Sequence, residues 1–135
     1  MTKPIKIILF LFIISLPLFA DNNLKASSPL FPIFQDGKYG YIDKTGKIVI
    51  NPQFTDSSSF SEGLAKVRIG KKYGYIDRTG KLVINSRFVW ASDFSEGLAA
   101  VLKGGKFGYI DIAGGIVIEP LFDDAKDFSE GLAIV

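Results

Sequence analysis

Apolar and polar positions alternate over short stretches, and this pattern returns every 34 residues. In one period the stretch 64–69 places apolar residues on one face and Lys66 and Arg68 on the other, which predicts a half-buried strand. A second strand is predicted over 72–76, which is rich in aromatic and β-branched residues, and a third over 81–84. No stretch of the period keeps a 3.6-residue apolar spacing long enough for a stable helix. Each period therefore predicts a three-stranded meander.

The rest of the period connects one meander to the next. Residues 85–93 have no clean alternation and predict a connection with room for one helical turn. Phe94-Ser95-Glu96-Gly97 then turns the chain into the next period. The sequence is thus divided into three repeats at about 30–63, 64–97 and 98–135, with Leu30 to Phe34 as the first strand.

Two turns recur in each repeat, and their residues suit the geometry of tight turns. An Asp at the first position accepts backbone N–H bonds two or three residues on, and a Gly adopts positive φ at no steric cost. We interpret these positions as structural. They are Asp43, Gly46, Asp77, Gly80, Asp111 and Gly114 in the first turn, and Gly63, Gly97 and Gly131 in the second.

The predicted fold class is all-β, with tandem three-stranded meanders. Propellers close with about four to eight blades of four strands, so three such units favour an open β-solenoid or curved array, with a partial β-propeller as the alternative. The sequence stops at Val135, within a strand that no hairpin follows, which predicts an open edge. Self-association through this C-terminal strand, pairing with another protein, and truncation of a longer array are the three explanations.

The N-terminus has the order of a secretory signal peptide over residues 1–20. A short basic start is followed by an apolar run, 7–20, and the small residue Ala20 before a polar stretch. The run has 14 residues, fewer than the roughly 20 that cross a bilayer as a helix. We expect cleavage, a linker over 21–29, and export to the periplasm, cell envelope or extracellular space. The alternative is an uncleaved leader that anchors the repeats to the membrane.

Composition narrows the chemistry. The chain has no Cys and no His, which excludes a disulfide framework, a thiolate or His zinc site and a His-based triad. Of 16 basic residues, Lys3 and Lys6 lie in the leader, which leaves 14 against 14 acidic residues. A nearly neutral chain without a basic stripe is not expected to bind nucleic acid. No cofactor and no metal are expected.

A longer motif carries a family resemblance. The run from Lys38 to Ile50, Lys-Tyr-Gly-Tyr-Ile-Asp-Lys-Thr-Gly-Lys-Ile-Val-Ile, followed by Phe60-Ser61-Glu62-Gly63-Leu64-Ala65, resembles the WG (KWG) repeat family. The family's usual Trp before the Gly is replaced by Tyr39, Tyr73 and Phe107. The resemblance implies an all-β repeat array of exported bacterial proteins and no defined reaction.

The recurring carboxylates allow two interpretations. Hard cations prefer carboxylate oxygens, so ladders of acids could hold cations, and two carboxylates could hydrolyse a glycan. We favour turn chemistry, because near-identical repeats give near-identical environments and a catalytic pair needs two unlike ones. The two ladders are Asp43, Asp77 and Asp111, and Glu62, Glu96 and Glu130.

Aromatic residues are the candidate binding residues. Trp90 is the only Trp and stands where the other copies have Asp56 and Asp124. We expect the divergent connections 51–59, 85–93 and 119–127 to line one binding face. The candidates are Trp90, Phe88, Tyr39, Tyr73 and Phe107.

A purely structural interpretation of these aromatic residues remains open. In it, Trp90 caps an apolar cluster with Phe88 and Val89, and the aromatic stripe is core. The functional hypothesis is an exported, non-catalytic scaffold that contacts protein or glycan. The alternatives are a carboxylate-based glycan hydrolase and a truncated repeat fragment without independent function.

Overall fold

The computed structural model describes residues 4–9 and 28–135, and within these ranges every helix or strand element is a β-strand. The all-β prediction is confirmed for these residues. They contain no helix with the length and apolar character needed to cross a membrane. Most of the predicted leader, 1–20, and of the linker, 21–29, lies outside the described residues.

Each repeat contributes three main strands, and the connections contribute short ones. The first repeat has β2 (Phe31–Gln35), β3 (Lys38–Ile42) and β4 (Ile48–Phe54); the second has β6 (Ala65–Ile69), β7 (Lys72–Ile76) and β8 (Leu82–Phe88); the third has β10 (Leu98–Lys103), β11 (Lys106–Asp111) and β12 (Ile116–Phe122). Between the repeats lie β5 (Asp56–Ser57) and β9 (Trp90–Ala91), and at the ends β1 (Ile7–Leu9) and β13 (Leu132–Ile134).

The connections are more regular than the sequence predicted. β8 continues to Phe88 instead of ending at Ile84, and β9 follows in place of the expected helical turn. β9 pairs with β10, so a connection adds a fourth strand to the sheet of the next repeat. The sheet orders are β2-β3-β4, β5-β6-β7-β8 and β12-β11-β10-β9, all antiparallel.

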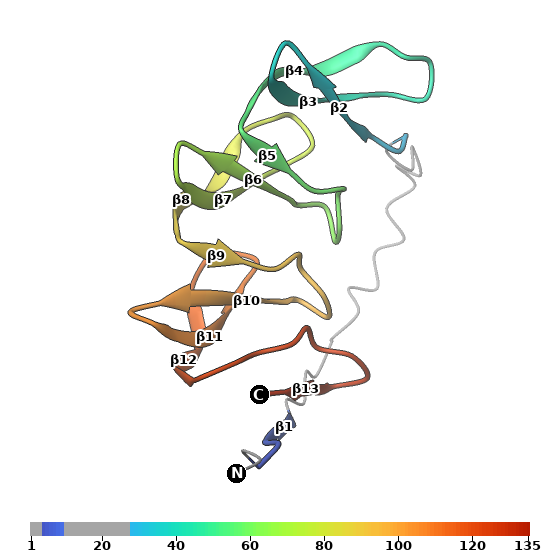
Figure 1. The fold of residues 1–135 in the computed structure, drawn as a ribbon. Helices are drawn as coiled ribbons and strands as arrows, with labels where there is room; N and C mark the ends of the chain where they lie inside the picture. Colours follow the sequence, from blue (N-terminus) through green and yellow to red (C-terminus); the bar gives the residue numbers. More distant parts are fainter. Residues whose placement is uncertain (1–3, 10–27) are drawn as a thin grey trace.

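The sheets stack one above the other into an open column (Figure 1). The sheet of β2–β4 lies at one end, and the terminal strands β1 and β13 lie together at the other. No ring closes in the segments that the structure describes. The open repeat array is therefore confirmed.

The hydrophobic core is built at the junctions between repeats. The middle core joins Tyr75 and Phe88 of the second repeat to Ala99, Val101 and Ile110 of the third, and all five side chains are at most 3% exposed. The first core uses equivalent positions of the preceding repeat. Burying one such large side chain stabilises the fold by about 1.5–3 kcal/mol. Each repeat therefore completes its core only with its neighbour.

A backbone contact explains the Gly that follows each aromatic residue of the stripe. Tyr73 pairs with Phe88, and Tyr75 pairs with Ile84. β7 therefore advances by two residues where β8 advances by four, so β8 carries a bulge. The bulge lies so close to Gly74 that a Cβ there would be 2.5 Å from the Ile84 carbonyl oxygen. Only glycine fits under this bulge, which recurs over Gly40 and Gly108.

The C-terminal edge, which the sequence predicted to be open, is occupied in the full chain. β13 pairs with β1 in antiparallel register, with Ile8 opposite Ala133. Two further backbone hydrogen bonds, both between Lys6 and Val135, extend the ladder at 3.0 and 2.8 Å. Nothing in the sequence signals this pairing, because residues 7–9 have the pattern of the apolar run of a leader.

Candidate functional site

The aspartates of the first ladder accept hydrogen bonds within their own turns. Asp43 Oδ1 accepts hydrogen bonds from Thr45 N at 2.8 Å, Thr45 Oγ1 at 2.6 Å and Lys47 N at 3.1 Å. The bonds from Thr45 hold the pKa of Asp43 below its usual range, and those from Thr79 do the same for the pKa of Asp77. Asp111 accepts from the amides of Ala113 and Gly115. These carboxylates act as turn acceptors.

No cation site is formed by the described residues. Nowhere among them do three Asp or Glu side chains gather closely enough to hold a metal ion. The Asp turns belong to separate repeats, and each carboxylate bonds within its own turn. The cation interpretation of the ladders therefore gains no geometric support from these residues.

The glutamate ladder links successive repeats. Glu62 Oε2 accepts from Gly97 N at 2.9 Å, and Glu96 Oε2 accepts from Gly131 N at 2.9 Å. The neighbouring serines add a parallel row, with Ser61 Oγ donating to the Phe94 carbonyl at 2.7 Å. The Phe-Ser-Glu-Gly motif is thus a stacking device that acts across a junction. The sequence pattern predicts a turn at this motif and does not reveal the contacts that cross to the next repeat.

Three buried tyrosines are also structural. Tyr41, Tyr75 and Tyr109 are at most 1% exposed, and each hydroxyl donates at 2.7 Å to a carbonyl 17 residues on. Burial raises the pKa of Tyr41 and of Tyr109 to about 12 and raises the pKa of Tyr75 further. The ring of Tyr75 meets Phe94 edge-on at 4.8 Å between centroids. Nothing in the sequence pattern alone distinguishes these three tyrosines from the other aromatic residues of the repeats.

The candidate aromatic residues separate into core and surface. Phe88 is 3% exposed and lies in the middle core, so it offers no binding surface. Tyr39 is half-buried and packs on Phe34, with 4.8 Å between ring centroids. Tyr73 and Phe107 are also half-buried and contact the preceding connection. Phe88 is therefore no longer a candidate binding residue, whereas Tyr39, Tyr73 and Phe107 are partly exposed at the surface.

Trp90 has a partner that the sequence did not predict. Its ring meets Phe107 of the third repeat edge-on at 5.4 Å. At the equivalent junction of the preceding repeat, the Tyr73 hydroxyl donates to Asp56 Oδ2 at 2.9 Å. The change from Asp to Trp in the connection therefore accompanies the change from Tyr to Phe in the next repeat. A polar pair at one junction is replaced by a ring pair at the other.

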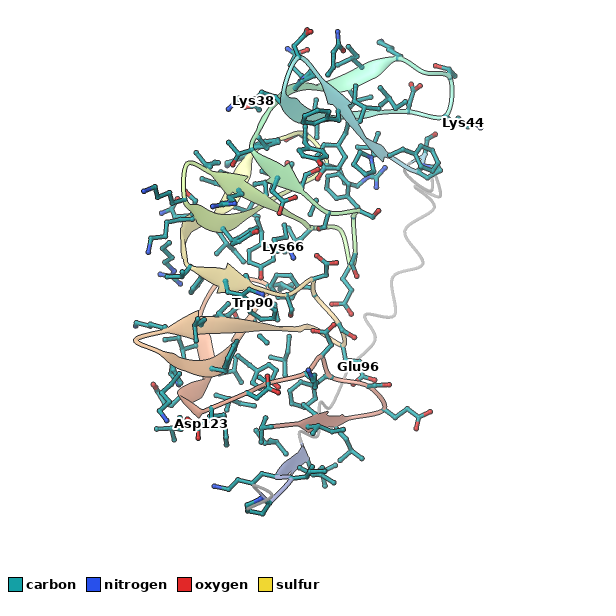
Figure 2. The ribbon with its side chains drawn as sticks, in the orientation of Figure 1. Lys38, Lys44, Lys66, Trp90, Glu96 and Asp123 are labelled. Atoms are coloured by element: carbon teal, nitrogen blue, oxygen red, sulfur yellow. The ribbon has the colours of Figure 1, made fainter. Side chains whose placement is uncertain are left out.

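Trp90 is still 41% exposed and borders a shallow pocket of about 320 Å³. Figure 2 shows Trp90 and Lys66 midway along the column. Lys66 Nζ lies 3.8 Å from Asp93 Oδ1, and both side chains line the same pocket as Trp90. The connections 85–93 and 119–127 meet here, whereas 51–59 does not contribute. We call this the Trp90 pocket; it is lined by Lys66, Trp90, Ser92, Asp93, Ala125, Lys126 and Asp127.

Stacked antiparallel repeats, each with a bulge over a glycine at the same position, define a β-repeat protein. The chain belongs to the WG containing repeat family, whose model matches residues 39–73, 73–107 and 107–135. Comparison with curated proteins gave no match, and comparison with solved structures gave none either. The resemblance seen in the sequence is thereby confirmed.

Proposed function

We propose that this protein is an exported, non-catalytic binding scaffold that contacts protein or glycan through the Trp90 pocket. The observation that carries the proposal is the partly exposed indole of Trp90 beside two cations and two carboxylates. The pocket is formed by β6 and by the two connections 85–93 and 119–127, so it joins two successive repeats.

The chemistry of the pocket suits both ligand classes. A half-exposed indole offers a large apolar face at small entropic cost, and Trp is frequent among residues that dominate binding energy. The Lys and Asp side chains around it supply donors and acceptors that fix a ligand's orientation. A sugar ring or an extended polar peptide meets both requirements.

Two further observations support a non-catalytic, exported role. The pKa values of Asp43 and Asp77 are lowered, whereas a glycosidase acid needs a raised one, so these two carboxyls do not suit that role. The basic start, apolar run and Ala20 of the leader have the order that directs secretion.

The test uses Trp90 as its own reporter, because the chain contains one Trp. Soluble cell-wall glycan fragments and a library of short extended peptides are titrated into the full chain while indole fluorescence is recorded. We expect one class to change the emission saturably. Lys66→Ala and Asp127→Asn should each weaken that binding several-fold, because both side chains line the pocket.

Val89→Ala is the matched control, since Val89 is 58% exposed and does not line the pocket. It should bind as the wild type does. A ligand whose affinity is equal in all three variants, or a complete lack of response to both classes, would count against the Trp90 pocket as the site. Export is tested separately: N-terminal sequencing of protein recovered from cells should begin near Asp21 rather than at Met1.

A further inference from the structure

The pairing of β1 with β13 repeats the geometry of a regular hairpin. In the third repeat, Ala99 of β10 stands opposite Ile110 of β11. The residue 34 positions after Ala99 is Ala133, and it stands opposite Ile8. β1 therefore occupies the place that the second strand of a repeat, such as β11, holds beside the first strand. Ile8 stands in the position of Ile110.

Ile8 also takes over the packing role of that position. Ile110 is fully buried in the core of the preceding repeat, and Ile76 is buried in the same way at the junction before it. Ile8 packs against the third core, which contains Tyr109, Phe128 and Ala133. An aliphatic side chain from outside the repeats thus completes the last junction.

Only one of the three side chains of β1 points inward. Ile7 and Leu9 are 63% and 62% exposed, whereas Ile8 between them is partly buried. This alternation is that of an extended strand added to a sheet edge, where backbone bonds supply affinity and alternate side chains supply specificity. The edge therefore accommodates an extended strand with one aliphatic side chain facing the core.

An unfilled cleft lies beside the N-terminal segment that pairs with β13. A cleft of about 480 Å³ remains between Pro4–Lys6 and the end of the third repeat, and its lining is mostly apolar. Leu121, in this lining, is 71% exposed. A longer or bulkier segment than β1 has room to bind at this edge.

We propose that the edge of β13 is a strand-accepting site. It binds an extended segment of another protein, antiparallel to β13, with a branched aliphatic residue in the position of Ile8, once Pro4–Leu9 is withdrawn. In the wild-type chain, Pro4–Leu9 leaves the edge only if the leader is removed, as proposed above. The ability of the β13 edge to accept a strand does not depend on that removal. In the full chain, Pro4–Leu9 occupies the site intramolecularly in place of that segment.

The experiment uses the full chain and a labelled peptide with the sequence of Pro4–Leu9. Ile8→Lys places a charge against the third core and should displace the tethered strand, which frees the edge for the peptide. Ile7→Lys adds the same charge at the neighbouring residue, on the exposed face, and should leave the edge closed. A tethered segment competes at an effective concentration in the millimolar range, so we expect I8K to bind the peptide at least about tenfold more tightly than wild type or I7K.

Equal binding to all three chains, or no binding to folded I8K, would overturn the proposal. I8K dimers that the peptide disperses would support it, because the peptide and the second copy then compete for the same edge; dimers that the peptide leaves intact would contradict it. Ile8→Ala is the second variant if I8K does not fold, and it should give the same ranking with a smaller difference. These outcomes do not depend on secretion, so a failed export test leaves them readable.

Discussion

At the scale of single residues, the glycine under each bulge has less room for a Cβ than the other glycines whose surroundings the structure describes. Gly74→Ala would place a methyl group 2.5 Å from the Ile84 carbonyl oxygen and 2.7 Å from Ser86 N. Backbone atoms cannot move aside as a flexible side chain can, so we expect a loss of about 3 kcal/mol in the free energy of unfolding, measured by urea denaturation.

Gly115→Ala is the control for this substitution. A Cβ at Gly115 would come no closer than 3.4 Å to its neighbours, and the other two repeats carry Lys47 and Lys81 at this position. Its stability should stay within about 0.5 kcal/mol of wild type. Similar losses for the two alanine variants would mean that the bulge does not restrict residue 74.

The buried tyrosines predict a stability change at alkaline pH. Burial raises the pKa of Tyr109 to about 12, above the ordinary value of 10.0. Between these two values the unfolded chain loses the phenolic proton and the folded chain keeps it, so ionisation favours unfolding. The free energy of unfolding should therefore be unaffected by this group below about pH 10 and fall as the pH rises toward about 12.

Tyr109→Phe isolates this effect, because it removes one titrating group and leaves all lysines in place. Its urea midpoint should fall less steeply than that of wild type across the alkaline range. Parallel curves would show that Tyr109 titrates alike in the folded and unfolded chains. At neutral pH the variant should lose about 1 kcal/mol, since the Lys126 carbonyl loses its donor.

At the scale of elements, each short strand from a connection is matched to the strand of the next repeat. Asp56 pairs with Tyr73 through a hydrogen bond, and Trp90 pairs with Phe107 through ring contact. Trp90→Asp leaves a carboxylate against a ring, and Phe107→Tyr crowds the indole with a hydroxyl. We expect each single variant to lose about 1 kcal/mol or more of stability.

The double variant should recover at least half of the summed loss, because it recreates the pair found at the earlier junction. A double-mutant cycle by thermal or urea unfolding measures this coupling. Strictly additive losses would show that the two positions do not interact, and that the paired difference between the junctions has no energetic basis.

The elements also show where sequence reasoning reached its limit. The alternation over 64–69 and the aromatic run 72–76 predicted β6 and β7 to within one residue, because period two is a local property of the chain. β9 was missed, since two residues cannot show a period and its pairing with β10 is set by stacking. Trp90 was identified as unusual, but its contact with Phe107 depends on which repeats lie side by side.

At the scale of the whole molecule, stability depends on contacts between neighbouring repeats. Glu62 and Glu130 both adopt positive φ, at 53° and 51°, and both are exposed. Glu62 accepts the Gly97 amide across a junction, whereas no described residue offers Glu130 an equivalent amide. Glu62→Ala should therefore lower the free energy of unfolding by about 1 kcal/mol more than Glu130→Ala does.

Glu62 and Glu130 have nearly the same positive φ, so alanine changes the backbone strain equally at both positions. The difference between the two losses of stability therefore measures the contact of Glu62 with Gly97 alone. Hydrogen exchange should locate the loss at Gly97 and its neighbours rather than throughout the column. Equal stabilities for the two variants would mean that the glutamate ladder does not hold the repeats together.

The Phe-Ser-Glu-Gly ladder has a consequence for how such a chain can change in length. Ser61 and Ser95 make the same bond to the following repeat, and Glu62 and Glu96 do likewise. Because the ladder uses the same Ser and Glu positions at each junction, a repeat copied within the gene brings its ladder contacts on both sides. Duplication or loss of whole 34-residue units would therefore keep the Ser and Glu bonds at each remaining junction, while the ring pair of Trp90 and Phe107 would be kept only where these two repeats stay adjacent.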